Sequence, residues 1–289
     1  MALAACGGGP RGTGAGGGGG AAGAGGVAGA GGRGGAGPVT ALLVDADQSS
    51  NNDDPDFPPS YSDALFRVDL AAGGIPYETV VLPSASGAAR LSLAQLERFT
   101  AVVWYTADAT TQLFSPDEQS AVEQWLDLGG KTLLFFSENL LADIGAGGDW
   151  MTPNDDAFLG SYLGAAGWAA DGDTDVAGAG PLSLKGRIYT VDGAAGTPLA
   201  GMHFEVFGNT PLESTADLVN PGAGTVVLAT TDADPAGSGS NSATPVIVRR
   251  SVGTSTIIYA GMPVENIDGA PGNTSTELVH GILQSAGLL

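Results

Sequence analysis

The sequence is poor in the residues that build several common kinds of site. Its 289 residues include one cysteine, two histidines and ten lysines and arginines. A single cysteine excludes an intrachain disulfide and a cysteine-based metal cluster. No run of 18 apolar residues occurs, so the sequence predicts no transmembrane helix. There is no G-x-G-x-x-G after the first apolar run and no Walker loop, so no nucleotide cofactor is expected.

Basic residues are especially scarce in the part that can fold. The formal net charge is −21, and after residue 38 there are 31 acids against 8 bases. Such a field repels phosphate backbones, so nucleic acid is not an expected partner. The excess of acid is typical of a secreted or high-salt protein, and also of ordinary surface solvation.

Glycine, in contrast, is abundant and concentrated at one end. Of 48 glycines, 19 lie in residues 1–38. This segment has no hydrophobic period and cannot bury enough apolar surface to offset the entropy of ordering it. We therefore predict a disordered, Gly-rich linker over residues 1–38 and one folded domain over residues 39–289.

Cys6 lies in the context LAACG, which resembles the lipobox of bacterial lipoproteins, in which the cysteine becomes the lipidated N-terminus. The glycine-rich tether is also typical of such proteins. Only five residues precede Cys6, too few for a signal peptide, so this interpretation requires a start upstream of Met1. It predicts a cell-envelope or extracellular location, with membrane contact only through the lipid. The alternative is that Cys6 is an incidental thiol.

Strand and helix patterns alternate through the first half of the folded part. The expected strands are residues 39–44, 77–82, 100–106 and 132–136, and the expected helices are residues 61–70, part of 91–99, and a helix that begins after Ser115 and ends at Gly129 and Gly130. This alternation predicts a parallel sheet covered by helices. The second half has looser patterns: helices at 155–163 and 273–286, an acidic, glycine-rich segment at 168–180, and short strands within 187–207 and at 225–229, 245–249 and 256–260, which look like antiparallel strands that extend the sheet.

The chain is organised around residues 130–144, GKTLLFFSENLLADI. An apolar run stops abruptly at Ser137, Glu138 and Asn139, and a helical pattern resumes at Leu140. A buried strand that ends in a polar turn before a helix is where α/β proteins place their chemistry. We therefore expect Ser137 and its neighbours at the functional edge of the sheet.

With these segments placed, residues 39–289 resemble the class I glutamine amidotransferase-like fold, most closely the branch found in secreted bacterial proteins. The matching segments are LLVDAD, SYSDAL, LERFTAVVWYTAD, SPDEQSAVEQWLDLGGKTLLFFSEN, DAFLGSYLGA and IIYAGMPVENI. The resemblance implies an α/β, flavodoxin-like three-layer sandwich. Its central sheet is mainly parallel, with an added antiparallel extension in the second half.

The resemblance also implies that the catalytic groups are replaced. The family's cysteine elbow, G-x-C-x-G, corresponds to FFSEN, so Ser137 stands at the cysteine position and both glycines are absent. The family's F-H-P-E segment corresponds to residues 262–265, with Pro263 at the histidine position and Glu265 retained. A serine without a base is a poor nucleophile. His203 and His280 are the only imidazoles that could replace the base, and each is more typical of a structural residue.

Two functions follow as hypotheses. The first is a non-catalytic binding or scaffolding domain at the bacterial cell envelope, with an envelope protein or glycan as partner and Asp45, Asp47, Ser137 and Asn139 as ligand-binding candidates. The second is a hydrolase that uses Ser137 or the carboxylates Asp45, Glu138 and Glu265.

The loop after the first strand has oxygen ligands at the spacing of a calcium loop. Asp45, Asp47 and Asp53 occupy its first, third and ninth positions, but Ser50 replaces the turn glycine and Asp56 the final glutamate. Ca²⁺ held by Asp45, Asp47 and Asp53 is thus the most specific metal hypothesis, and a solvated turn-forming loop is its alternative.

Overall fold

The computed structural model describes residues 40–46, 61–82, 91–106, 113–140, 144, 158–170, 190–206, 216–231, 243–262, 264, 267 and 273–289. All of them lie in the unit Gly37–Leu289. No helix among them is long and apolar enough to cross a membrane.

The first half follows the predicted alternation. Its elements are β1 (Ala41–Asp45), α1 (Tyr61–Ala72), β2 (Tyr77–Val81), α2 (Leu93–Leu96), β3 (Ala101–Tyr105), α3 (Pro116–Asp127) and β4 (Thr132–Phe136). Local signals set the helix ends. Ser115 caps α3 by accepting from the Glu118 N–H at 3.3 Å, and the Glu118 side chain accepts from the Ser115 N–H at 3.0 Å. Gly129 and Gly130 end α3 with φ of 79° and 67°, which side chains other than glycine rarely adopt.

The second half contains η1 (Phe158–Leu163), β5 (Ala165–Ala170), β6 (Thr190–Gly193), β7 (His203–Glu205), β8 (Leu218–Pro221), β9 (Val226–Thr231), β10 (Thr244–Val252), β11 (Ser255–Ala260) and α5 (Ser275–Ser285). Two strands here were not predicted. β5 includes residues 168–170 of the acidic, glycine-rich segment, and it pairs with β8 in a separate two-stranded sheet. The strand at 256–260 was expected among the antiparallel strands. β11 pairs antiparallel with β10, as expected, but it also pairs parallel with β4.

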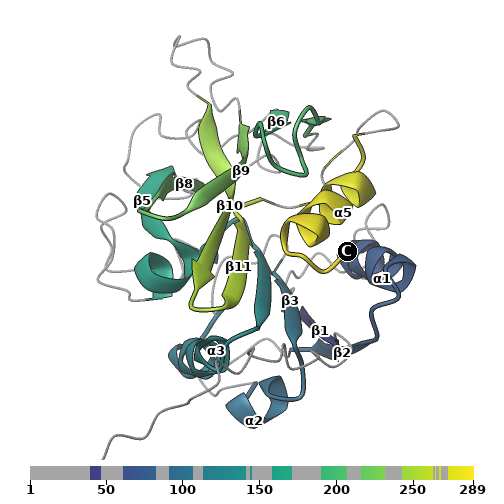
Figure 1. The fold of residues 1–289 in the computed structure, drawn as a ribbon, viewed down its shortest axis with the longest axis vertical. Helices are drawn as coiled ribbons and strands as arrows, with labels where there is room; N and C mark the ends of the chain where they lie inside the picture. Colours follow the sequence, from purple (N-terminus) through teal and green to yellow (C-terminus); the bar gives the residue numbers. More distant parts are fainter. Residues whose placement is uncertain are drawn as a thin grey trace, which may run out of the picture. The chain divides into compact units, whose positions relative to one another are not determined.

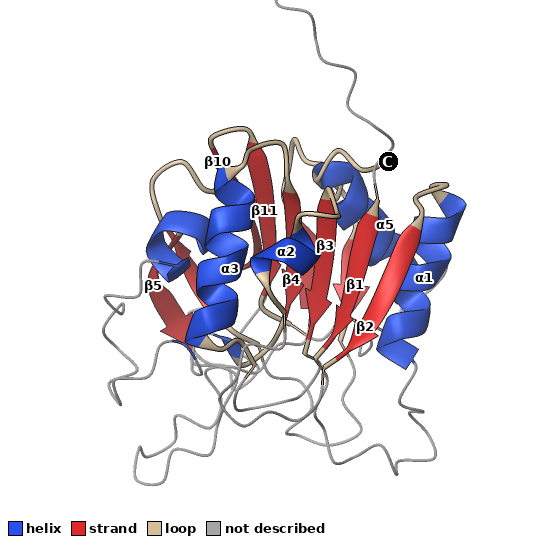
Figure 2. Ribbon diagram, turned by 90° about the horizontal axis from the view of Figure 1, so that it is seen from below, coloured by secondary structure: helices blue, strands red, loops and turns tan. Residues whose placement is uncertain are grey.

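The main sheet has nine strands in the order β2-β1-β3-β4-β11-β10-β9-β6-β7. β2, β1, β3, β4 and β11 are parallel, and the remaining strands are antiparallel to their neighbours. This confirms a mainly parallel centre with an antiparallel extension. The arrowheads of the parallel strands point to one edge of the sheet, which we call the carboxyl edge (Figure 2).

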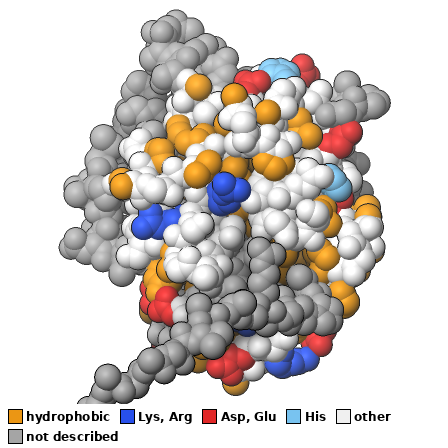
Figure 3. Space-filling model, in the orientation of Figure 1, with side chains coloured by type: hydrophobic (Ala, Val, Ile, Leu, Met, Phe, Trp, Pro, Cys, Tyr) orange, Lys and Arg blue, Asp and Glu red, His pale blue; other side chains and the backbone are white. Residues whose placement is uncertain are grey.

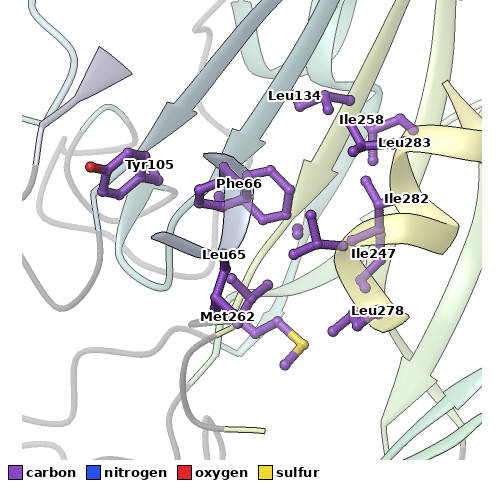
Figure 4. Packing of buried hydrophobic residues seen from close by; sticks show 14 of the residues in the cluster. Leu65, Phe66, Tyr105, Leu134, Ile247, Ile258, Met262, Leu278, Ile282 and Leu283 are labelled. Atoms are coloured by element: carbon purple, nitrogen blue, oxygen red, sulfur yellow. The ribbon is translucent and has the colours of Figure 1, made fainter. Parts of the chain in front are cut away.

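Helices cover both faces of the sheet, with α1 and α5 on one side and α2 and α3 on the other (Figures 1 and 2). Each face has its own apolar cluster. Leu43, Leu134 and Ile258 pack with α1 and α5 in the α1/α5 core, part of which Figure 4 shows. Leu133 and Tyr259 pack with α2 and α3 in the α3 core. Because successive strand residues alternate between the two cores, buried strands are apolar throughout, as the sequence indicated.

Candidate functional site

The hydrogen-bond ladder continues one residue beyond the parallel strands and brings their following residues together at the carboxyl edge. The Thr106 N–H donates to Phe136 O at 3.1 Å, and the Ser137 N–H donates to Ala260 O at 3.0 Å. Thr106, which follows β3, and Ser137, which follows β4, therefore lie side by side. The prediction that Ser137 ends the central strand is confirmed.

Ser137 is enclosed, with only 1% of the residue exposed. Its hydroxyl oxygen accepts from the Thr106 hydroxyl at 2.7 Å and from the Asn139 N–H at 3.3 Å. Its carbonyl oxygen accepts from the Tyr259 hydroxyl at 3.1 Å. A hydroxyl oxygen has two acceptor positions, and here both hold a hydrogen bond. Ser137 thus lies within a fixed hydrogen-bond network.

Tyr259 links Ser137 to a buried carboxylate that the sequence did not single out. The Tyr259 hydroxyl lies 2.6 Å from Asp217 Oδ2, and neither residue is exposed to solvent. The Asp217 N–H donates to Gly261 O at 2.7 Å. In the sequence, Asp217 lies between the apolar residues Ala216 and Leu218, and this apolar context was the signal that could have indicated its burial. Its partner, Tyr259, is 42 positions away in the sequence.

The two residues after Ser137 are buried as well. Glu138 is 6% exposed and Asn139 is 2% exposed. The Asn139 amide nitrogen donates to Glu138 Oε1 at 3.4 Å. Asp45, at the end of β1, is half-buried, and its carbonyl oxygen accepts from the Leu82 N–H at 2.7 Å. The structure therefore places Asp45, Ser137, Glu138 and Asn139 at one edge, with Asp45 the most accessible of the four.

Both histidines of the chain are bound to other groups. His203 on β7 lies opposite Asp192 on β6, with Nδ1 2.6 Å from Asp192 Oδ1. His280 on α5 has Nδ1 3.6 Å from Asp69 Oδ1. Neither is hydrogen-bonded to Ser137, and the two histidines are separate on the surface shown in Figure 3. Neither imidazole is in place to act as a base for Ser137.

The Asp69 carboxyl on α1 is also buried, away from the predicted site. It is 3% exposed, and burial raises its pKa above the ordinary value of 3.8 while the nearby His280 opposes the rise. Among the described residues, no group donates a hydrogen bond to Asp69 Oδ2.

Several predicted residues lie outside the described residues: Cys6, Asp47, Asp53, Pro263 and Glu265. The calcium site can thus be compared with the structure only at Asp45. Within the described ranges, no three His, Cys, Asp or Glu side chains are grouped so as to hold a metal ion.

A search of solved structures found a protein of this architecture. A ThuA-like protein from Bacteroides uniformis superposes with a TM-score of 0.51 and 12% identity, over 85% of this chain and 90% of that one. ThuA-like proteins have a class I glutamine amidotransferase-like fold. This chain has that fold. In this sheet, Ser137 directly follows β4.

Two further similar structures have lower TM-scores. A β-galactosidase from Bacillus circulans gives 0.49 at 13% identity, over 86% of this chain and 30% of the enzyme. A cytoplasmic protein from Salmonella typhimurium gives 0.49 at 11% identity, over 85% and 98% of the two chains. This chain thus spans about a third of the length of the glycosidase. No protein-family model and no curated protein sequence matches the chain.

Proposed function

We propose that residues 39–289 form a non-catalytic, amidotransferase-like binding or scaffolding domain, and that residues 1–38 tether it at the bacterial cell envelope. One observation carries the first part. Both acceptor positions of Ser137 Oγ hold hydrogen bonds, from Thr106 and Asn139, in a residue that is 1% exposed. A nucleophile must direct a lone pair at its substrate and pass its proton to a base.

The position of the two imidazoles supports the same proposal. His203 and His280 each lie against their own aspartate. Activation of serine usually requires a base within hydrogen-bond reach, with that base oriented by a third group. The hydroxyl of Ser137 instead belongs to a network that holds the end of β4 in place.

The envelope location rests on the lipobox-like context of Cys6 and on the glycine-rich segment that follows it. A flexible tether of this composition would hold the folded domain away from a membrane surface and let it reach an envelope protein or glycan.

The rival function is a hydrolase that uses Ser137 or the carboxylates Asp45, Glu138 and Glu265. One set of contacts favours it. Asn139 donates through its backbone to Ser137 Oγ and through its side chain to Glu138 Oε1, so a buried carboxylate and the serine share one neighbour. A carboxylate so placed could serve as a base through a rearranged Asn139.

Hydrolysis assays separate the two functions. L-Glutamine, p-nitrophenyl acetate and p-nitrophenyl glycosides are incubated with the full chain, with Ser137→Ala and with Glu138→Gln. We expect all three proteins to give the rate of a buffer blank. Hydrolysis by the full chain that falls at least about tenfold in either variant would establish the hydrolase.

Calcium binding is a separate proposal at the Asp45, Asp47 and Asp53 loop. A ligand that binds only the folded state raises the melting midpoint by mass action. We expect millimolar Ca²⁺ to raise the midpoint of the full chain, chelator to reverse the rise, and Asp47→Asn to abolish it. A midpoint unchanged by Ca²⁺ would leave the loop a solvated turn.

A further inference from the structure

The residues around Asp217 cross the carboxyl edge from one face of the sheet to the other. Ala216 and Leu218 are buried in the α1/α5 core, and Val219 is buried in the α3 core. Asp217 lies on the same side as Val219, since its carboxylate meets Tyr259 of the α3 core. Residues 216–219 therefore straddle the end of the sheet, and we call them the strap.

The strap is attached next to Ser137. β11 ends at Ala260, whose carbonyl oxygen accepts from the Ser137 N–H, and the next carbonyl oxygen, of Gly261, accepts from the Asp217 N–H. The contact is close, because a Cβ on Gly261 would come within 2.2 Å of Asp217 O. Ser137 and the strap are thus bound to consecutive carbonyl groups at the end of one strand.

One side chain joins the two. The Tyr259 hydroxyl is within hydrogen-bond distance of Asp217 Oδ2 at 2.6 Å and of Ser137 O at 3.1 Å. Glycine at 261 allows this close approach. The Tyr259 hydroxyl gives the buried Asp217 carboxylate a hydrogen-bond partner, which a solvent-exposed carboxylate would find in water.

We propose that the strap is a built-in closure over the Ser137 edge, and that it opens locally, with the main sheet still folded, to admit solvent and small molecules to Ser137. The strap's contacts beside Ser137 include a main-chain bond to Gly261 and the Tyr259–Asp217 bond, and its second half, Leu218 and Val219, is anchored in β8 by pairing with β5. The sheet beneath is held by full ladders on both sides of β4. Local openings of this kind require less free energy than global unfolding. The proposal concerns access to Ser137 and holds whether or not the domain catalyses a reaction.

Thiol labelling measures this opening directly. In full-length chain with Cys6→Ser, a reporter cysteine is placed by Ser137→Cys beneath the strap or, as a control, by Val103→Cys at the fully buried middle of β3. Iodoacetamide labelling is followed by mass spectrometry at increasing urea below the unfolding transition. We expect Ser137→Cys to label faster than Val103→Cys, at a rate nearly independent of urea, because a local opening exposes little surface.

Two second-site variants assign the opening to the strap. Tyr259→Phe removes the bonds from the Tyr259 hydroxyl to Asp217 Oδ2 and to the carbonyl oxygen of residue 137, and should speed labelling of Ser137→Cys about tenfold. Leu96→Ala truncates a buried leucine of α2, which precedes β3 at the opposite edge of the sheet. It should speed labelling of Val103→Cys and leave that of Ser137→Cys unchanged, since strap opening breaks no contact of Leu96. Far-UV circular dichroism checks that each variant is folded.

Three results would overturn the proposal. Equal labelling of the two reporters, with the same urea dependence and the same response to Leu96→Ala, would mean that only global unfolding exposes Ser137. Labelling of Ser137→Cys at the rate of a free thiol would mean that the edge is not closed. A rate unchanged by Tyr259→Phe would mean that Tyr259 does not hold the strap. None of these results depends on hydrolytic activity, so failure of the strap is distinguishable from failure of the non-catalytic function.

Discussion

Asp217 and Asp69 are both buried aspartates, yet the structure treats them differently. Asp217 lies at the carboxyl edge with the Tyr259 hydroxyl at 2.6 Å and its own N–H bonded to Gly261. Asp69 lies between α1 and α5 with His280 at 3.6 Å and no donor on Oδ2 among the described residues. Burying a carboxyl is costly unless hydrogen bonds replace its water. The Asp217 carboxylate should therefore stabilise the fold around it, and the Asp69 carboxylate should destabilise it.

The largest effect is expected from Tyr259→Phe. It removes a hydroxyl that serves a buried carboxylate, so we expect the free energy of unfolding to fall by about 2–3 kcal/mol. Tyr162→Phe is a matched control, because the Tyr162 hydroxyl donates to Asp127 at 3.1 Å on an exposed surface. It should cost less than about 0.5 kcal/mol. Urea unfolding measures both, and equal costs would contradict the special role of the buried pair.

Gly261→Ala tests the close approach of the strap. A methyl group would come within 2.2 Å of Asp217 O, a main-chain atom that cannot rotate away. We expect a loss of about 2 kcal/mol, the usual cost of overpacking. Gly160→Ala adds a methyl group in η1, where nothing lies within 4 Å, and should be neutral. A neutral Gly261→Ala would show that the strap is not held against β11.

Ser137→Ala should cost about 1 kcal/mol, because the Thr106 hydroxyl and the Asn139 N–H lose their acceptor. Thr106→Val should cost a similar amount. The double variant should cost less than the sum, since both single changes break the same bond. Strict additivity in urea unfolding would contradict the Thr106–Ser137 bond.

The smallest effect concerns Asp69. Because its folded pKa is raised above 3.8, the folded chain binds the proton more tightly than the unfolded chain does. The stability from this group is full below pH 3.8 and is lost as the pH rises through the folded pKa. Asp69→Asn removes this loss. The free energy of unfolding of the variant, minus that of the parent, should therefore increase as the pH rises from 3.8 and become constant above the folded pKa of Asp69.

The control for this titration is His280→Gln. Without the imidazole, the pKa of Asp69 should rise further, and the loss of stability should extend to higher pH. Urea midpoints measured between pH 3 and 7 test both variants. A difference between parent and Asp69→Asn that does not change with pH would show that Asp69 does not titrate as described.

The sequence predicted the parts of the fold that local signals determine. Ser115 followed by Pro116 and Glu118, and the paired glycines 129 and 130, mark the two ends of α3. Apolar runs of strand length located β1, β3 and β4. Ser137 was predicted to end the central strand because the apolar run stops there.

The strap and the small sheet were not predictable in the same way. β5 has the sequence AAGWAA and β8 has LVNP. β5 has no β-branched residue, and in β8 the one β-branched residue, Val219, is followed by asparagine and proline, which are depleted in strands. Each of these two strands forms its ladder with the other, so neither can be recognised from its own residues alone. Apart from the neighbouring Asn139, the hydrogen-bond partners of Ser137 are Thr106, which follows β3, and Tyr259 and Ala260 of β11. Its burial therefore depends on distant segments that no local pattern encodes.

The central claim is that Ser137 is a structural serine in an amidotransferase-like fold. A fluorophosphonate probe, which forms a covalent bond only with activated serines, tests it most directly when the adduct is located by peptide mass spectrometry. We predict no adduct on Ser137 in the folded full chain and no difference between that chain and Ser137→Ala. A stoichiometric adduct on Ser137, absent from Ser137→Ala, would show an activated nucleophile and contradict the account.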